Sequence, residues 1–207
     1  VSAAGAHIDE LDGVIAGVEN LIKDDGVFVM EVGYFVDVFQ NKWFDTIYHE
    51  HVDFHSVAPF QKLFSRVGME IISVQRIEPQ GGSIRVMTQK KGGKFQRDSS
   101  VDILINLEKS FNLDKAKTFI KFNRKIRLIS KKLQKLIYNL KVQGKTIAGF
   151  GAPPKAMTLM THFNLDETVL DFIVDDNPLK QNLYTPISHI PILSADALYT
   201  LRPDYVI

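Results

Sequence analysis

Helical patterns alternate with short apolar runs along most of the chain, and this alternation constrains the fold more than any other feature. Residues 9–23 carry apolar side chains at helical spacing, and residues 27–32 follow as a nearly continuous apolar run. Such a run is typical of a strand that is buried on both faces, as in a parallel sheet. Helix, turn and buried strand in succession predict an α/β fold.

The next elements are predicted from turn residues and periodicity. Residues 59–67 are expected to form a helix that Gly68 closes. Residues 70–77 and 83–89 are predicted to be two antiparallel strands, joined by a turn with two glycines. Residues 115–142 show a long helical pattern with many lysines. We interpret it as an amphipathic connecting helix with a solvated basic face, and a nucleic-acid or membrane helix is the alternative.

A second α/β unit is predicted after that helix. A short strand at residues 146–148 leads into a glycine turn at 149–155 and a helix at 156–163. A strand at residues 169–174 follows, and weaker patterns continue the alternation with strands at 190–193 and 204–207 and a helix at 195–200. Alternation of this kind is typical of a parallel sheet.

Composition limits the classes of partner. The chain has 207 residues and a formal net charge of +1, so no strong field favours binding to nucleic acid. No apolar run approaches the roughly 20 residues that span a membrane. We therefore expect neither a nucleic-acid nor a membrane partner, and a cytoplasmic location. The absence of cysteine excludes disulfides and thiolate metal sites within this chain. The sequence starts at Val1 and stops within an apolar run, so we expect a fragment of a longer protein.

Residues 44–55 concentrate titratable side chains. This segment holds three histidines, three acids, a tyrosine and a threonine. Histidine takes and gives a proton near neutral pH, and a neighbouring carboxylate or phenol can orient it. The segment therefore predicts a proton-transfer site. Tyr48, Glu50 and His51 can converge only if the backbone turns, so we expect a loop.

Two other interpretations of this segment remain open. His49, His51 and His55 could hold a metal ion with one of the acids. The acids are interleaved with the histidines and no helical pair of histidines is formed, so we predict no metal site. The segment could also be a polar cluster with a purely structural role.

Two glycine-rich turns are candidate ligand sites. The Gly-x-Gly pair at Gly149 and Gly151 opens a predicted helix, where backbone N–H groups can hold a phosphate. Asp175 ends the next strand, about where nucleotide-binding folds place a ribose-binding acid. The third glycine of the dinucleotide fingerprint is missing, because Pro154 occupies its place. A tight turn without a ligand is the alternative.

The second turn is Gly81-Gly82-Ser83-Ile84-Arg85. Two glycines before a strand let the backbone pass close to a ligand, and Arg85 can clamp an anion or a carbonyl. A plain hairpin turn with a surface arginine is the alternative.

The order of four motifs, at residues 44–51, 81–85, 149–155 and 174–180, resembles the S-adenosylmethionine-dependent C-methyltransferases that act on nucleotide-linked keto-deoxysugars. The resemblance covers nearly the whole chain. Members of that family have a zinc-binding piece, a methyltransferase domain that holds the methyl donor, and a Rossmann-like domain that anchors the nucleotide sugar.

The resemblance implies how the chain is organised. Residues 1–92 would be the trailing half of a class I methyltransferase sheet, ending in an antiparallel strand pair. Residues 93–143 would be a helical connector, and residues 144–207 a truncated Rossmann-like domain that binds the nucleotide sugar. S-adenosylmethionine would be bound mostly by a missing N-terminal part, and the isolated chain is expected to be inactive. The oligomeric state is left open.

The resemblance also implies a reaction and its residues. A base removes a proton from a carbon beside a ketone, and the enolate attacks the methyl group. His51 matches the base, Tyr48 and Glu50 match residues that orient it or bind substrate, and His7 matches another active-site histidine. The implied substrate-binding residues are those of the two turns: Gly81, Gly82, Ser83, Arg85, Gly149, Gly151, Ala152, Lys155 and Asp175.

Departures and alternatives limit this assignment. His49 stands where some members have an acid, so it is not expected to be catalytic, and Gln80 and Gly33 also depart from the family's pattern. One alternative is a nucleotide-sugar-binding fragment without chemistry. Another is an NAD-dependent oxidoreductase, based on the Gly-x-Gly turn.

Overall fold

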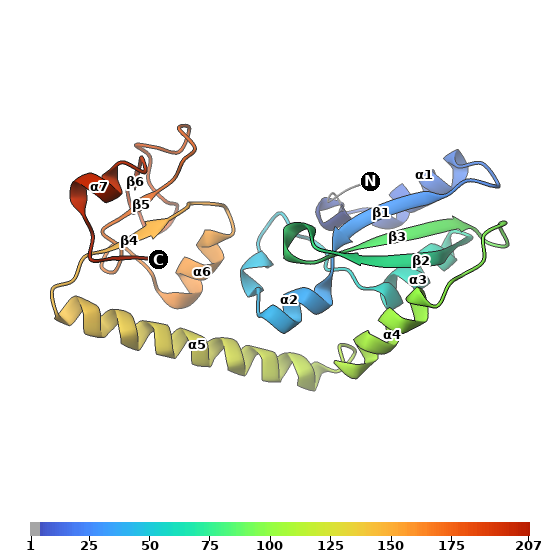
Figure 1. Ribbon diagram of the computed structural model, residues 1–207, viewed down its shortest axis with the longest axis horizontal. Coiled ribbons are helices and arrows are strands. Elements are labelled where there is room, and N and C mark those ends of the chain that lie inside the picture. Colours follow the sequence, from blue (N-terminus) through green and yellow to red (C-terminus); the bar gives the residue numbers. More distant parts are fainter. Residues whose placement is uncertain (1–4) are drawn as a thin grey trace. The chain divides into compact units, whose positions relative to one another are not determined.

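The computed structural model describes residues 5–207 and shows an α/β protein (Figure 1). Residue contacts divide the chain into two compact units. The first contains the described residues up to Phe44 together with His49–Phe122, and the second contains Asp45–Tyr48 and Asn123–Ile207. The domain limits that we place after residues 92 and 143 stay predictions.

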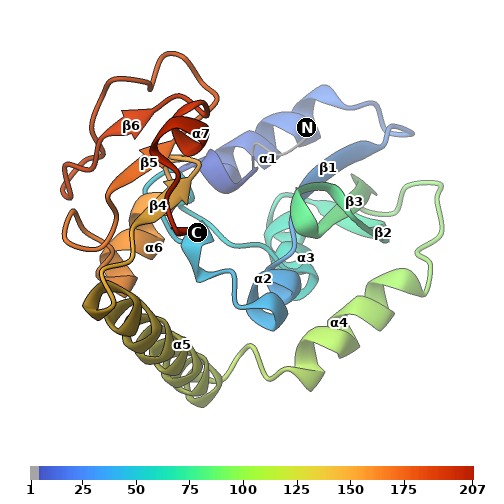
Figure 2. The ribbon, with the colours of Figure 1, turned by 60° about the vertical axis from the view of Figure 1, so that its left-hand side comes forward.

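The first unit is built on a three-stranded antiparallel sheet (Figure 2). Its strands are β1 (Phe28–Gly33), β2 (Met69–Ile77) and β3 (Ser83–Lys90), in the order β1-β3-β2. The predicted antiparallel pair β2-β3 is confirmed. The prediction for β1 is wrong in one respect: β1 pairs antiparallel with β3, and Val29 is 38% exposed. An apolar run does not separate this case from a strand buried on both faces, because one face of an antiparallel sheet can meet solvent.

Four α-helices accompany this sheet among the described residues of the first unit: α1 (Leu11–Leu21), α2 (Phe35–Asn41), α3 (Val57–Arg66) and α4 (Ser100–Ser110). The helices predicted at 9–23 and 59–67 are confirmed, and Gly68 closes the second in the left-handed conformation (φ 75°). Buried side chains of α1, α3, α4 and the strands form one core, which includes Ile15, Val86, Phe64 and Val101. The histidine segment leads directly into α3, and this core holds α3 in place.

A buried carboxylate of α4 caps the N-terminus of α3. The Val57 and Ala58 amides donate to the two Glu108 carboxylate oxygens, at 2.6 Å and 2.9 Å. The Tyr34 hydroxyl donates to the same carboxylate at 3.1 Å. Burial, and then the nearby Glu108 charge, raise the pKa of Tyr34 well above its usual value. Ser56, the N-cap residue, makes no side-chain capping bond, so Glu108 supplies the acceptor that this helix end needs.

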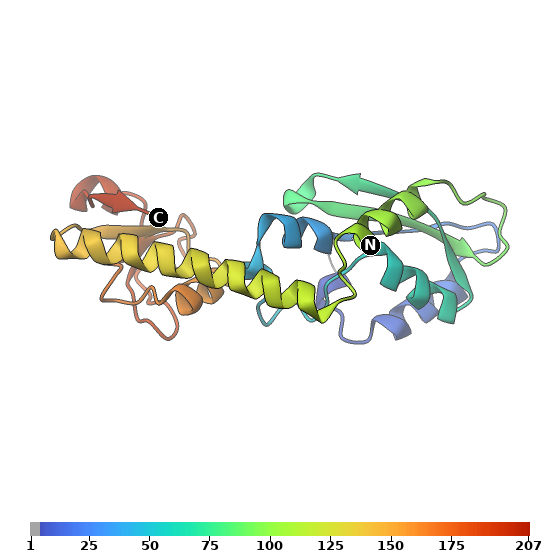
Figure 3. The ribbon, with the colours of Figure 1, turned by 90° about the horizontal axis from the view of Figure 1, so that it is seen from below.

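Helix α5 (Ala116–Val142) is one continuous helix, as predicted for residues 115–142 (Figure 3). Its side chains Ile126, Ser130 and Ile137 are buried, and the lysine-rich remainder is mostly exposed. The Gln134 side-chain amide donates to the Phe163 carbonyl at 3.2 Å, which ties α5 to the end of α6. Within residues 5–207, no helix combines the length and the apolar character needed to cross a membrane.

The second unit contains a four-stranded parallel sheet. Its strands are β4 (Ile147–Phe150), β5 (Phe172–Val174), β6 (Ile192–Leu193) and β7 (Tyr205–Val206), in the order β6-β5-β4-β7. Helices α6 (Ala156–Phe163) and α7 (Ala197–Leu201) lie in the connections β4–β5 and β6–β7. The predicted alternation of strands and helices is confirmed, with β5 starting later than expected.

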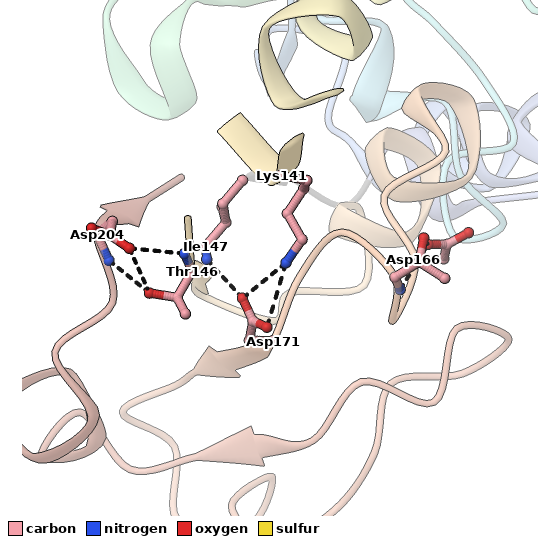
Figure 4. Close-up of polar contacts among 7 residues, drawn as sticks. Lys141, Thr146, Ile147, Asp166, Asp171 and Asp204 are labelled. Carbon is pink, nitrogen blue, oxygen red and sulfur yellow. Dashed lines mark hydrogen bonds and ion pairs between the residues drawn. The ribbon is translucent and has the colours of Figure 1, made fainter. Parts of the chain in front are cut away.

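Two carboxylates fix the amino-terminal edge of this parallel sheet (Figure 4). Asp171, directly before β5, accepts the Ile147 amide at 2.7 Å and pairs with Lys141 at 3.3 Å. Asp204, directly before β7, accepts the Thr146 amide at 2.9 Å. Because the strands are parallel, the Gly-x-Gly motif and Asp175 lie toward the opposite, carboxyl-terminal edge. That is the edge where ligands bind in α/β folds of this kind.

Candidate functional site

The histidine segment is irregular, as predicted. After the 3₁₀ turn η2 (Phe44–Thr46) there is no helix or strand before α3, apart from one isolated bridge between His55 and Tyr34. The segment is also divided between the two units: Asp45–Tyr48 cluster with the second unit and His49 onward with the first.

The structure brings His7 and His51 together. Their rings meet edge to face with centroids 5.0 Å apart. The 3₁₀ turn η1 (Gly5–His7) runs beside the segment, and the Val52 amide donates to the Ala6 carbonyl at 2.9 Å. The sequence separates these two histidines by more than forty positions, so only the fold places them side by side.

A backbone contact sets the tautomer of His7. The Nδ1 atom of His7 lies 2.8 Å from the carbonyl oxygen of Glu50. A carbonyl oxygen only accepts, so Nδ1 must carry the proton. In the neutral ring, Nε2 of His7 is then an acceptor. The histidine pair therefore offers at least one basic nitrogen with a defined orientation.

The remaining members of the segment are placed as follows. The Glu50 carboxylate lies 3.9 Å from Nε2 of His49, and both side chains are largely exposed. Glu50 thus contacts His7 through its carbonyl and His49 through its carboxylate, and its support of His51 stays a prediction. Tyr48 belongs to the second unit, where its amide donates to the Thr46 carbonyl at 3.2 Å.

His55 is a buried histidine with a structural environment. Its ring stacks on Phe60 with centroids 4.7 Å apart, and only 6% of the residue is exposed. Burial lowers the pKa of His55. The ring is therefore neutral at neutral pH and packs as part of the core. Among residues 5–207, no three histidine, aspartate or glutamate side chains gather so that they could hold a metal ion.

Packing within the chain accounts for the glycines of the first turn. Gly81 and Gly82 have φ of 86° and 154°. A Cβ atom at Gly81 would lie 2.6 Å from the ring of Trp43, and one at Gly82 would lie 2.5 Å from the carboxyl group of Asp37. The Asp37 side chain in turn pairs with Arg76. Both glycines therefore permit a close approach of the chain to itself, and their contact with substrate stays a prediction.

The other two candidates of this turn also have partners within the first unit. The Ser83 hydroxyl donates to the Pro79 carbonyl at 3.0 Å. Arg85 pairs across the sheet with Glu31, with Nη2 2.9 Å from the carboxylate. An anion-binding role for Arg85 stays a prediction, and it would require Arg85 to share or leave Glu31.

The second glycine turn begins later than predicted. Gly149 lies inside β4 and not in the turn, and a Cβ atom there would lie 2.9 Å from Ile173 on β5. Close packing of neighbouring strands therefore explains this glycine. Gly151 is the residue that turns the chain: its φ is 87°, and its amide donates to the Val174 carbonyl at 2.7 Å.

Asp175 closes this turn from the end of β5. Its carboxylate accepts the Ala152 amide at 2.8 Å and the Asn177 amide at 2.8 Å. Lys180 lies 3.2 Å from the same carboxylate and donates to the Ala152 carbonyl at 3.1 Å. The Ala152 amide, then the Asn177 amide and Lys180, lower the pKa of Asp175. Sequence reasoning paired Asp175 with Gly151 but missed Lys180, although Lys180 stands in the same motif.

Lys155 holds the start of the histidine segment. We call residues 45–48 the strap. The Lys155 ammonium lies 3.7 Å from the Asp45 carboxylate, and the Thr158 hydroxyl donates to the Ile47 carbonyl at 3.2 Å. Both contacts lie within the second unit. No sequence signal pointed to them, because the partners are more than a hundred positions apart.

Comparison with known proteins identifies the family of this chain. A family model described as the C-methyltransferase C-terminal domain matches residues 78–207. The chain is also 31% identical over 200 residues to the C-methyltransferase NovU of Streptomyces niveus. That alignment covers 97% of this chain and 48% of the relative, so the chain spans about half of the relative's length. The chain therefore belongs to the family of proteins that carry the C-methyltransferase C-terminal domain.

Proposed function

We propose that this chain is the substrate-side part of an S-adenosylmethionine-dependent C-methyltransferase. Its substrate is a nucleotide-linked keto-deoxysugar, and the methylated atom is a carbon next to the ketone. The observation that carries the proposal is the His7–His51 pair, with ring centroids 5.0 Å apart, in a chain of this family. A cytoplasmic location is part of the proposal.

His51 is the proposed base. Removal of a proton from the carbon leaves the electron pair of the C–H bond in an enolate, and that carbon is then the methyl acceptor. A histidine matches this task because it exchanges protons near neutral pH. His7 lies against His51 with Nδ1 committed to the Glu50 carbonyl, so it orients the pair and can pass the proton onward. Tyr48 and Glu50 are proposed to support His51 or bind the sugar.

Two features of the fold support a methyltransferase part in the first unit and a nucleotide-sugar site in the second. The first sheet ends in the antiparallel pair β2-β3, as expected for the trailing half of a class I methyltransferase sheet. If the strands β4 to β7 are numbered 1 to 4 along the chain, their order in the second sheet is 3-2-1-4. The first four strands of the nucleotide-binding Rossmann sheet have the same order. The order reverses beside β4, and the Gly151 turn follows β4 directly. A nucleotide sugar at this point agrees with the rule for ligands in such sheets.

The described residues of the first unit lack the kind of turn that would bind the methyl donor. A donor of this kind needs a glycine-rich turn between a strand and a helix, and residues 5–122 contain no Gly-x-Gly sequence. S-adenosylmethionine supplies a methyl group on a sulfonium when it is bound. We therefore assign none of the residues 5–122 to the donor and place its binding in another part of the intact protein.

Hydrogen–deuterium exchange tests the base directly, without the donor. The intact protein is incubated in D₂O with uridine- and thymidine-diphosphate-linked keto-deoxysugars, and deuterium at the carbon beside the ketone is measured by mass spectrometry. We expect exchange with the unmodified protein and with His49→Ala, and loss of exchange with His51→Ala. His49→Ala is the matched control, since this exposed histidine stands only two positions away. Exchange at an unchanged rate in His51→Ala would refute the assignment.

A nucleotide-sugar-binding module without chemistry is the second candidate. It is favoured by the Gly151 turn, Asp175 and Lys180, which form a complete cluster within the second unit alone. If the intact protein binds the nucleotide sugar but neither exchanges the proton nor transfers a methyl group, this candidate replaces the methyltransferase proposal.

A further inference from the structure

Carboxylates of the chain itself hold the cationic and N–H groups around the second glycine turn. Asp175 accepts the Ala152 amide at 2.8 Å and lies 3.2 Å from Lys180. Asp45 pairs with Lys155, one residue before α6 begins. A phosphate bound at this turn would use the same kinds of group: backbone amides, a lysine and the N-terminal end of a helix. An incoming anion must therefore compete with a carboxylate that is already in place.

The two carboxylates are held with very different strength. Asp175 has hydrogen bonds from two amides in addition to Lys180, and its side chain is 11% exposed. For Asp45, the polar contact found among the described residues is the ion pair of its carboxylate with Lys155 at 3.7 Å. The Asp45 side chain is 17% exposed and that of Lys155 52%, so the pair is screened by solvent from the lysine side. Its separation of 3.7 Å exceeds hydrogen-bond distance, and we expect it to contribute about 1 kcal/mol. Asp45 is thus the more weakly held of the two carboxylates.

We propose that Asp45 occupies the place of a phosphate of the nucleotide sugar at Lys155, and that binding of a nucleoside diphosphate displaces it. The inference rests on the proposed function of the second unit as a nucleotide-sugar site. A phosphate carries more negative charge than a carboxylate and has more acceptor oxygens, so it is the stronger partner for a lysine. The helix dipole of α6 favours the same exchange.

Displacement of Asp45 would remove one of the contacts that attach the histidine segment to the second unit. The strap is attached to α6 by the Lys155–Asp45 pair and by the Thr158–Ile47 hydrogen bond. Its last residue is Tyr48, and His51 follows three positions later. Loss of the ion pair removes one of these two attachments to α6, and the hydrogen bond between Thr158 and Ile47 remains. Occupancy of the nucleotide site is thereby coupled to the segment that carries the proposed base.

Calorimetric titration with uridine and thymidine diphosphate tests the competition. Asp45→Asn removes the internal competitor, so we expect the Kd to fall about two- to fivefold, which corresponds to a solvent-screened ion pair. Lys155→Gln is expected to raise the Kd. In the Lys155→Gln background, the effect of Asp45→Asn is expected to be smaller, because the ion pair is absent and only the repulsion between Asp45 and the phosphate remains. Glu167→Gln is the matched control, since it removes one exposed negative charge from the same unit.

A second readout follows the strap itself. Trp43 is the single tryptophan of the chain and lies two positions before Asp45. We expect nucleoside diphosphate to shift its fluorescence in the unmodified chain, and the shift to be largely lost in Asp45→Asn. Equal Kd values for the unmodified chain and Asp45→Asn would overturn the competition. Absence of nucleotide binding in every variant would instead overturn the proposed nucleotide site, so the two failures are distinguishable.

Discussion

Replacement of Glu108 by alanine tests how the end of the histidine segment is held. The Glu108 carboxylate accepts hydrogen bonds from the Val57 amide, the Ala58 amide and the Tyr34 hydroxyl, at 2.6, 2.9 and 3.1 Å. Val57 and Tyr34 are fully buried, and Ala58 is partly exposed. Alanine at position 108 therefore leaves two buried donors without an acceptor, whereas the third can turn to water.

The expected loss of stability follows from these contacts. A buried donor that loses its acceptor costs about 1–3 kcal/mol, so two such donors cost roughly 4 kcal/mol. Removal of the carboxylate also relieves part of the desolvation cost of its buried charge, so the net loss is smaller than this sum. We expect Glu108→Ala to lower the free energy of unfolding of the first unit by about 3 kcal/mol. Tyr34→Phe is the matched control and should cost only about 1 kcal/mol, since it leaves no donor unsatisfied.

Urea unfolding measures this loss. Trp43 lies in the first unit, so its fluorescence reports the unfolding of that unit. With a slope near 2 kcal/mol per molar urea, a loss of about 3 kcal/mol moves the midpoint by roughly 1.5 M. Far-UV circular dichroism reports the helices and strands of both units, and the part of its change that does not coincide with the tryptophan transition should not move. A midpoint shift below roughly 0.3 M for Glu108→Ala would show that the carboxylate does not stabilise the N-terminus of α3.

Three further changes probe single positions by urea unfolding. Gly82→Ala should cost at least about 2 kcal/mol, because its Cβ atom would lie 2.5 Å from the Asp37 carboxyl group, whereas Gly33→Ala meets nothing within 4 Å and should be nearly neutral. Ile187→Gly should stabilise the second unit by about 1 kcal/mol, since Ile187 is 80% exposed and has a φ of 69°. The lowered pKa of Asp175 implies stability that is present above about pH 4 and lost as the pH falls through the folded pKa. Asp175→Asn should therefore be less stable than the unmodified chain at pH 7, with the difference shrinking below pH 4.

Local patterns predicted most elements of the fold. Helices at 9–23, 59–67 and 115–142 show their spacing within the segment itself, and the structure has helices at each place. The antiparallel pair β2-β3 was predictable because its connecting turn contains two glycines between two apolar runs. The loop character of the histidine segment was predictable as well, since an extended chain cannot point neighbouring side chains in one direction.

Features that depend on distant parts of the chain were not predictable. The antiparallel pairing of β1 is decided by β3, which lies more than fifty positions away. The Gly-x-Gly sequence alone suggested that Gly149 belongs to a turn. Gly149 instead lies in β4, where its lack of a side chain lets it pack closely against Ile173 of β5. The contacts of Glu108 and Asp45 likewise join partners that share no local pattern. Sequence reasoning named Asp175 and left out Lys180, because only the folded turn shows both groups at Ala152.

The contacts of the histidine segment are consistent with the proposed role of His51. Its start is held by Lys155 and Thr158, its middle by η1, and its end leads into the N-terminus of α3, which Glu108 caps. The chain passes from the first unit into the second at the strap and returns directly after it, so the segment joins the two units covalently in addition to α5. A change at the strap therefore reaches His51 through only three peptide links beyond Tyr48. If the nucleotide sugar displaces Asp45, the base responds to the substrate that it is to deprotonate, and the rate of proton exchange should depend on the phosphates of that substrate. A keto-deoxysugar without its nucleotide should then exchange its proton slowly in the unmodified protein, and faster in Asp45→Asn.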